Sequence, residues 1–226
     1  MCSRRIGLAL VLDRSGSMQG QEANARTFAR AIANQLDLRP TADDDAHSTM
    51  TIITFSTSAT VNLALSQGVD AAAVEATISR IGTGSMPFSG GTNINAGLNQ
   101  AMPDLLGLGG AYLPVVLLFT DGQQNSIYGG NAAAIATAST LKAAGITVFA
   151  VGYGSSVSTS TLNAMASAPQ ETHSFVGSTM AQLTARFEAS LCSDIASASP
   201  SPPPSPPKPP PPPGEYPPHP SPPPPP

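Results

Sequence analysis

Two uninterrupted apolar runs constrain the fold more than any other feature, and each one ends in an aspartate. Residues 6–12 lead into Asp13, and residues 113–120 lead into Asp121. A strand that is apolar along its whole length is covered on both faces, as in a parallel sheet flanked by helices. Ligands of such sheets bind at the carboxyl ends of the strands. The two carboxylates therefore converge at one edge of the sheet if their strands are neighbours.

The segments around these runs alternate between helical and strand patterns. Helical spacing of apolar residues occurs in 25–36, 70–81, 94–101, 135–141, 162–166 and 180–191, and strand-like runs occur at 49–56, 60–65, 146–151 and 174–176. This order predicts an α/β fold: a doubly wound, mostly parallel six-stranded sheet flanked by helices, with one antiparallel edge made by the hairpin-like pair 49–56 and 60–65. Pro103 is expected to end or kink its helix, and Gly145 to stop the helix that follows in sequence.

The turn after the first strand carries oxygen-bearing side chains at alternate positions. Asp13, Ser15 and Ser17 project to the same side of a tight loop, and the glycine pair before Thr92 lets that hydroxyl reach the same edge. Together with Asp121 they offer only oxygen ligands, which suit a hard cation. Two carboxylates balance a divalent ion at most, so one coordination position stays open for an external Asp or Glu. The competing explanation for the first three residues is helix capping.

These residues carry a resemblance to the von Willebrand factor type A domain over residues 5–192. The family's metal-ion-dependent adhesion site, or MIDAS, has the pattern Asp-x-Ser-x-Ser, then a Thr in a second loop and an Asp in a third. The matching segments are Asp13-Arg14-Ser15-Gly16-Ser17, Gly91-Thr92-Asn93 and Thr120-Asp121-Gly122. The resemblance implies a Rossmann-like sheet, no catalysis, and Mg²⁺, with Mn²⁺ as a substitute and Ca²⁺ disfavoured.

The resemblance also assigns roles to individual residues of the site. Ser15 and Ser17 would bind the metal directly, whereas Thr92, Asp13 and Asp121 would bind it directly or through water. Candidates for a surrounding rim that contacts the ligand are Arg14, Gly91, Asn93 and Gln123.

The last part of the chain differs abruptly in composition. Of the 24 prolines, 19 lie in residues 200–226. Proline lacks an amide donor and fixes φ, so residues 198–226 are predicted to be an extended polyproline II tail or a disordered linker. The tail resembles hydroxyproline-rich wall glycoproteins, which implies sugar decoration and an extracellular stalk. The alternative is docking to a proline-binding domain such as an SH3 module or profilin.

Composition and missing motifs exclude several classes of function. A net charge of -4 and a pI near 5.2 disfavour binding to nucleic acid. No apolar run is long enough to cross a bilayer. The chain has no Gly-x-Ser-x-Gly elbow, phosphate loop or His-Glu-x-x-His stretch, which argues against a hydrolase, a nucleotidase or a metalloprotease.

The two cysteines, Cys2 and Cys192, flank the predicted domain. If its ends meet, a disulfide between them would constrain the unfolded chain by roughly 5 kcal/mol. Some extracellular members of the family that this chain resembles carry cysteines at these places. The other interpretation is two unpaired thiols in a reducing compartment. No signal-like apolar stretch precedes the first strand, so the chain is expected to be either cytosolic or a piece excised from a longer secreted protein.

The sequence therefore predicts a non-catalytic recognition module. In the favoured hypothesis, a metal-bearing domain on a proline-rich stalk of a cell-wall or extracellular matrix glycoprotein binds an acidic group of a protein or glycan. The alternative is an intracellular module for assembling protein complexes, whose tail docks to a proline-binding domain. A third hypothesis, an enzyme subunit whose activity resides in a partner chain, ranks last because nothing outside the metal edge is arranged for chemistry.

Overall fold

The computed structural model describes residues 5–39, 47–154 and 157–197. Within these ranges six strands form one sheet in the order β3-β2-β1-β4-β5-β6. All neighbouring strands are parallel except β2 and β3, which form the antiparallel edge. The prediction of a mostly parallel six-stranded sheet is confirmed. The strands are β1 (Ile6–Asp13), β2 (Thr49–Phe55), β3 (Ala59–Leu63), β4 (Leu113–Thr120), β5 (Thr147–Tyr153) and β6 (Ser174–Gly177).

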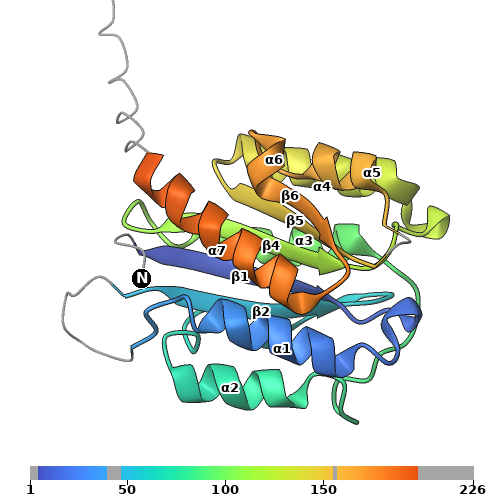
Figure 1. Ribbon diagram of the computed structural model, residues 1–226, viewed down its shortest axis with the longest axis horizontal. Helices are drawn as coiled ribbons and strands as arrows, with labels where there is room; N and C mark the ends of the chain where they lie inside the picture. Colours follow the sequence, from blue (N-terminus) through green and yellow to red (C-terminus); the bar gives the residue numbers. More distant parts are fainter. Residues whose placement is uncertain (1–4, 40–46, 155–156, 198–226) are drawn as a thin grey trace, which may run out of the picture.

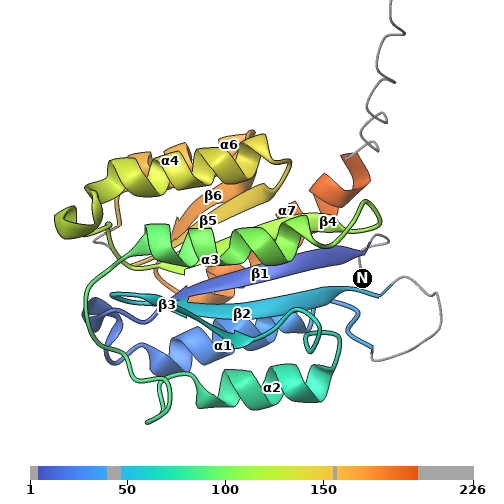
Figure 2. The ribbon, with the colours of Figure 1, turned by 180° about the vertical axis from the view of Figure 1, so that it is seen from behind.

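Helices cover both faces of this sheet (Figures 1 and 2). Apolar side chains of α1, α2 and α7 fill the core on one face, and those of α3, α4 and α5 fill the core on the other. The helices are α1 (Glu22–Ala33), α2 (Ala71–Arg80), α3 (Ile94–Leu106), α4 (Gly130–Ala143), α5 (Thr159–Met165), α6 (Gln170–His173) and α7 (Met180–Ser197), with the 3₁₀ turns η1 (Gly16–Met18) and η2 (Ser126–Tyr128).

Aromatic side chains join the helices to the central strands. The rings of Phe28 on α1 and Phe119 on β4 stack with centroids 4.6 Å apart. Phe149 on β5 meets Phe187 on α7 edge to face, with centroids 5.1 Å apart. All four side chains are fully buried, and each contributes roughly 1.5–3 kcal/mol through removal from water. The strand that leads to Asp121 is thus anchored in the core.

Capping residues set the ends of several helices. The Asp70 carboxylate accepts a hydrogen bond of 2.8 Å from the backbone N–H of Ala72 and begins α2. Asn93 accepts one of 3.2 Å from the N–H of Ala96 and begins α3. Gly145, at φ +82°, follows α4 in the left-handed conformation that favours glycine. The predicted stop at Gly145 is confirmed, and Asn93 places the start of α3 directly after Thr92.

Of the two outcomes predicted for Pro103, an end of the helix or a kink, the first is wrong. Helix α3 continues through Pro103 to Leu106. Proline removes one helical hydrogen bond, the one to the carbonyl of Asn99, but Asn99 is exposed, so that carbonyl lies close to water. Leu105, only 2% exposed, packs into the core and holds the last turn in place.

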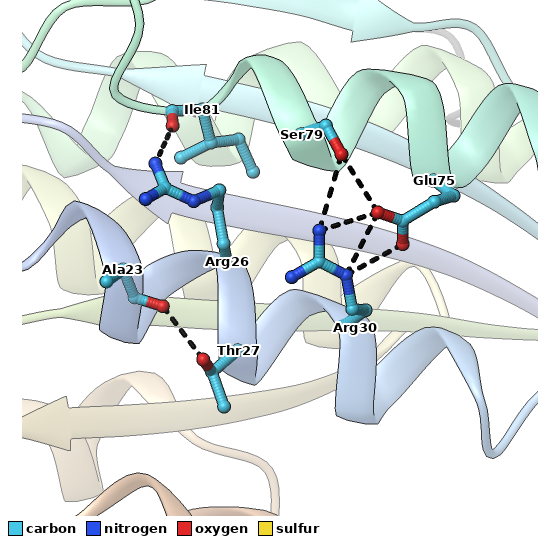
Figure 3. A network of polar contacts seen from close by, with 7 residues as sticks. All are labelled: Ala23, Arg26, Thr27, Arg30, Glu75, Ser79 and Ile81. Atoms are coloured by element: carbon cyan, nitrogen blue, oxygen red, sulfur yellow. Dashed lines mark hydrogen bonds and ion pairs between the residues drawn. The ribbon is translucent and has the colours of Figure 1, made fainter.

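Polar contacts join α1 to α2 on the outer surface (Figure 3). Arg30 donates to both carboxylate oxygens of Glu75, and the Ser79 hydroxyl donates to the same carboxylate at 2.9 Å. Arg26 donates to the backbone carbonyl of Ile81 at 2.6 Å. Since the Arg30 and Glu75 side chains are 42% and 48% exposed, their pairing is worth at most about 1 kcal/mol. These contacts fix the position of α2 and lie away from the strand ends.

Some predictions fall outside the described residues. They concern Cys2, the side chain of Cys192, and residues 198–226, so the disulfide and the proline-rich tail stay predictions from sequence. Within the described ranges, no helix combines the length and apolar character that a membrane span requires.

Candidate metal centre

The pairing of β1 with β4 brings Asp13 beside Thr120. Leu12 lies opposite Phe119 in this parallel pair, so the next residue on each strand is the polar one. The Thr120 hydroxyl donates a hydrogen bond of 2.6 Å to the Asp13 carboxylate. The chain winds from β1 to β2 on one side and reaches β4 on the other, so these strand ends form a switch point, where open α/β sheets bind ligands.

The loop after β1 and the residue after β4 form one chain of oxygen atoms. The backbone N–H of Ser15 donates to Asp13 Oδ1 at 2.8 Å, and the hydroxyl oxygens of Ser15 and Ser17 lie 3.1 Å apart. The Ser17 hydroxyl then donates to Asp121 Oδ1 at 2.8 Å. Fully buried Met18 anchors the 3₁₀ turn that curls this loop. Four of the five predicted ligands are therefore in direct contact.

The fifth predicted ligand, Thr92, lies at the same place. A methyl group built on Gly122 would be 3.9 Å from both the Thr92 and the Ser17 hydroxyl oxygens, so both hydroxyls lie next to Gly122. Asn125 holds Thr92 on both sides: its side-chain oxygen accepts from the Thr92 N–H at 2.5 Å, and its own N–H donates to the Thr92 carbonyl at 3.0 Å. The third loop thereby fixes the second.

Backbone hydrogen bonds also fix the second loop against the first. The N–H of Gly16 donates to the carbonyl of Gly90 at 3.0 Å, and the N–H of Ser89 donates to the carbonyl of Arg14 at 2.8 Å. Gly90 has φ +85°, and a Cβ there would lie 2.8 Å from the Thr57 hydroxyl. Glycine is therefore required at this position by both conformation and space.

Both carboxylates of the site are held in an environment that disfavours their charge. Burial raises the pKa of Asp13 from 3.8 to about 6, although hydrogen bonds from Ser15 and Thr120 partly oppose this, and the negative charge of Asp121 adds to it. Burial also raises the pKa of half-buried Asp121. Among the described residues, no nearby cationic side chain lowers either pKa. A bound cation would offset this cost.

The donor set fits a hard divalent cation. Two carboxylates and three hydroxyls supply oxygen alone, the ligand chemistry of Mg²⁺ and Mn²⁺. The described part of the chain contains no cluster of three or more His, Cys, Asp or Glu that could hold a metal. The proposed site has only two such residues, Asp13 and Asp121, because its other three donors are the hydroxyls of Ser15, Ser17 and Thr92.

The four predicted rim residues differ in how free their side chains are. Gln123 is exposed, and its oxygen accepts a hydrogen bond from a neighbouring asparagine amide. Arg14 is half-buried and donates to a backbone carbonyl of the second loop. Asn93 is occupied in capping α3, and Gly91 lies against the ring of Tyr128. Of the four, Gln123 is the one classed as exposed.

Sequence reasoning missed three residues that support the site. Thr120 bonds Asp13, and Asn125 holds Thr92, as described above. Gln124, only 5% exposed, accepts from the N–H of Asn95 at 2.6 Å and donates to the carbonyl of Tyr128 at 2.8 Å. Thr120 could have been found from the sequence, because it places a hydroxyl at the end of an apolar strand, directly before Asp121. No comparable signal in the sequence pointed to Gln124 and Asn125, because the roles of their amides depend on the conformation of the loop.

We predict that Asn125→Ala weakens Mg²⁺ affinity by roughly 10- to 100-fold, the usual cost of losing a residue that orients a metal ligand. Without the Asn125 side chain, the Thr92 N–H loses its acceptor, and only the backbone N–H of residue 125 still holds the Thr92 segment, so the Thr92 hydroxyl is less firmly positioned. Calorimetric titration with Mg²⁺ measures the change. Asn99→Ala, an exposed asparagine of α3, is the control and should bind like wild type. An affinity within about twofold of wild type would show that Asn125 does not position the site.

Comparison of the sequence with models of protein families finds a match over most of the chain. The family model of the von Willebrand factor type A domain matches residues 8–189. No curated protein matches the sequence.

Solved structures with the same fold include those of a matrix protein, an adhesin and a manganese-loaded protein. Proximal thread matrix protein 1 from the mussel byssus, with a zinc-occupied MIDAS motif, is 23% identical with a TM-score of 0.68, covering 86% of this chain and 46% of that chain. The pilus adhesin SpaC of Lactobacillus rhamnosus GG is 17% identical, with a TM-score of 0.67 and coverages of 85% and 30%. Manganese-loaded Plasmodium vivax TRAP protein is 18% identical, with a TM-score of 0.65 and coverages of 84% and 75%.

At these identities the likeness shows a shared fold. This chain covers 46% of the mussel protein and 30% of the adhesin.

Proposed function

The chain belongs to the von Willebrand factor type A family, and on this basis we propose that it is a non-catalytic module for metal-dependent adhesion or recognition. The observation that carries the proposal is the continuous contact from Asp13 through Ser15 and Ser17 to Asp121, with Thr92 beside it. Three loops that are far apart in sequence thus supply oxygen atoms to one place at the carboxyl ends of β1 and β4.

In this proposal Asp13, Ser15, Ser17, Thr92 and Asp121 hold Mg²⁺, which Mn²⁺ can replace. Burial raises the pKa of both carboxylates, and the positive charge of a bound ion would offset this cost. Ser17 is exposed, whereas Asp13 and Ser15 are buried, so the site opens to solvent on the side of Ser17. An acidic group of a partner reaches the site from that side. The hydroxyl ligands add no charge of their own, so the site keeps its attraction for that acidic group.

The proposed setting is extracellular. The structures of similar fold described above include a byssal matrix protein and a pilus adhesin, and matrix proteins and adhesins act outside cells. The proline-rich segment 198–226 would serve as a stalk, in keeping with its resemblance to hydroxyproline-rich wall glycoproteins. A disulfide between Cys2 and Cys192 belongs to the same proposal.

A binding experiment tests this function. The purified chain is screened against arrays of acidic peptides and wall glycans in Mg²⁺ and again with excess chelator. Binding is expected in Mg²⁺ and is expected to disappear in chelator. The proposal fails if binding persists without metal, or if calorimetry detects uptake of neither Mg²⁺ nor Mn²⁺.

The second candidate is an intracellular module for assembling protein complexes, and the proline-rich segment is the observation that favours it. Polyproline segments dock to aromatic grooves of SH3-like and profilin-like domains. Mass spectrometry of native material separates the two candidates. Oxidised Cys2 and Cys192 together with hydroxylated prolines support the extracellular proposal. Reduced cysteines and unmodified prolines support the intracellular one.

A further inference from the structure

A large apolar side chain stands in water in the loop that follows Asp121. Ile127 is 79% exposed, and the one other exposed large hydrophobic residue in the described part of the chain is Leu106, at 55%. Single exposed apolar residues are ordinary on protein surfaces. The significance of Ile127 therefore depends on how rigidly it is held and on what lies beside it.

The turn that carries Ile127 is held rigidly by hydrogen bonds. The carbonyl of Asn125 accepts from the N–H of Tyr128 at 3.0 Å and from that of Gly130 at 3.2 Å. The carbonyl of Tyr128 also accepts from the side chain of buried Gln124 at 2.8 Å. The backbone on both sides of Ile127 is thus fixed while its side chain projects into solvent. A rigidly presented side chain loses little conformational entropy on binding.

Two residues of this turn, Asn125 and Tyr128, contact the segment that carries Thr92. Asn125 bonds the Thr92 backbone, and a methyl group on Gly91 would lie 3.1 Å from the Tyr128 ring. Because Ile127 is two residues from Asn125, their Cα atoms are at most about 7.6 Å apart. The loops after β1 and β4 and the start of α3 lie at one end of the sheet (Figures 1 and 2). Ile127 therefore lies in a turn whose flanking residues, Asn125 and Tyr128, contact the segment that carries Thr92.

The surroundings of Ile127 in the sequence carry no charge of their own. Residues 122–131 contain no Asp, Glu, Lys or Arg, so the contacts this loop offers are apolar, aromatic, hydroxyl or amide. A peptide whose acidic group binds the metal, and whose chain then runs over the Thr92 segment, would meet this loop. An aliphatic side chain of the ligand would gain by covering Ile127, whereas a sugar hydroxyl placed over the Ile127 side chain itself would lose water without a hydrogen-bond partner.

We infer that Ile127 is a specificity-determining contact, and that the ligand is a protein segment in which an acidic residue is flanked by an apolar one. This inference rests on the proposed function, in which the metal binds the acidic residue. It narrows the ligand class from any carboxylate to a peptide with an Asp or Glu next to an aliphatic or aromatic side chain.

Two synthetic peptides and one polysaccharide test the inference. The peptides carry a single glutamate flanked on both sides by leucine or by serine, and the polysaccharide is polygalacturonate. Their affinities for the full chain are measured in Mg²⁺. We expect the leucine peptide to bind about tenfold more tightly than the serine peptide. Ile127→Ser should abolish this ratio, and Leu106→Ser should preserve it. Leu106 is the matched control because it lies at the far end of α3.

The outcomes separate this inference from the function on which it rests. Equal binding of the two peptides, or a preference that survives Ile127→Ser, overturns the inference and leaves metal-dependent recognition intact. Binding of polygalacturonate but of neither peptide has the same consequence. If no probe binds in a metal-dependent way, the proposed function itself fails. Thermal unfolding of Ile127→Ser should match wild type, because the side chain is exposed.

Discussion

The Asp13→Asn variant is expected to lose Mg²⁺ uptake completely and yet to be more stable than wild type when metal is absent. Asp13 has no exposed surface, and its pKa is raised from 3.8 to about 6. At pH 7 the folded apo protein therefore holds an ionised carboxylate at a cost of about 3 kcal/mol. Asparagine removes this charge with almost no change of shape.

The surrounding hydrogen bonds can accept the substitution. The side-chain oxygen of the introduced asparagine can still accept from the N–H of Ser15, as Asp13 Oδ1 does at 2.8 Å. Its amide can donate to the Thr120 hydroxyl, which lies 2.6 Å from Asp13 Oδ2 and is free to turn toward the carbonyl of Gly122, 3.5 Å away. Each of these polar groups keeps a partner, so the gain in stability should approach the full cost of the charge.

Urea unfolding at pH 7 in chelator, together with Mg²⁺ calorimetry, measures both effects. Asp104→Asn on α3 is a matched control, since it removes one negative charge away from the carboxyl ends of the strands. It should leave Mg²⁺ affinity unchanged. If Asp13→Asn unfolds more easily than wild type in chelator, the carboxylate is not a source of instability in the apo site. If it still takes up Mg²⁺, Asp13 is not a ligand.

Much of this site was predictable because of where strands end. Asp13 and Asp121 each follow a mostly apolar run, and this pattern predicted a buried strand before each aspartate. Both strands are confirmed. Alternate positions in a tight loop then placed Ser15 and Ser17 with Asp13. Whether β1 and β4 are neighbours could not be derived from periodicity, because every buried strand of such a sheet looks alike. The sequence left that adjacency as a condition, and the pairing of β1 with β4 shows that it is met.

The supporting residues were not predictable, because their roles depend on contacts between loops. Asn125 and Gln124 lie in a loop rich in amides, and nothing in the sequence shows that one holds Thr92 and the other fixes the turn at Tyr128. The continuation of α3 past Pro103 has a similar origin. Local propensity favoured a helix end there, but the burial of Leu105 in the core outweighed it. Tertiary packing decided both cases.

Without metal, the domain is expected to lose stability as the pH rises from about 4 to about 6. The folded-state pKa of Asp13, about 6, exceeds its unfolded value of 3.8, so the folded chain binds more protons within this interval. Stability then falls with pH, by about 3 kcal/mol in total from this residue, and levels off above the folded pKa. Half-buried Asp121, with its pKa also raised by burial, acts in the same direction.

Partly buried Asp37 and exposed Glu75 act in the opposite direction, because hydrogen bonds from Arg39 and Arg30 lower the pKa values of their carboxylates. The measurement that isolates Asp13 is therefore the difference in unfolding free energy between Asp13→Asn and wild type, followed in chelator across this interval. This difference should be small near pH 4 and reach about 3 kcal/mol at pH 7. Mg²⁺ should restore the lost stability at pH 7, and its affinity should drop about tenfold per pH unit below the folded pKa, because binding then displaces a proton from Asp13. A flat difference curve would show that the buried carboxylate is already compensated without a metal.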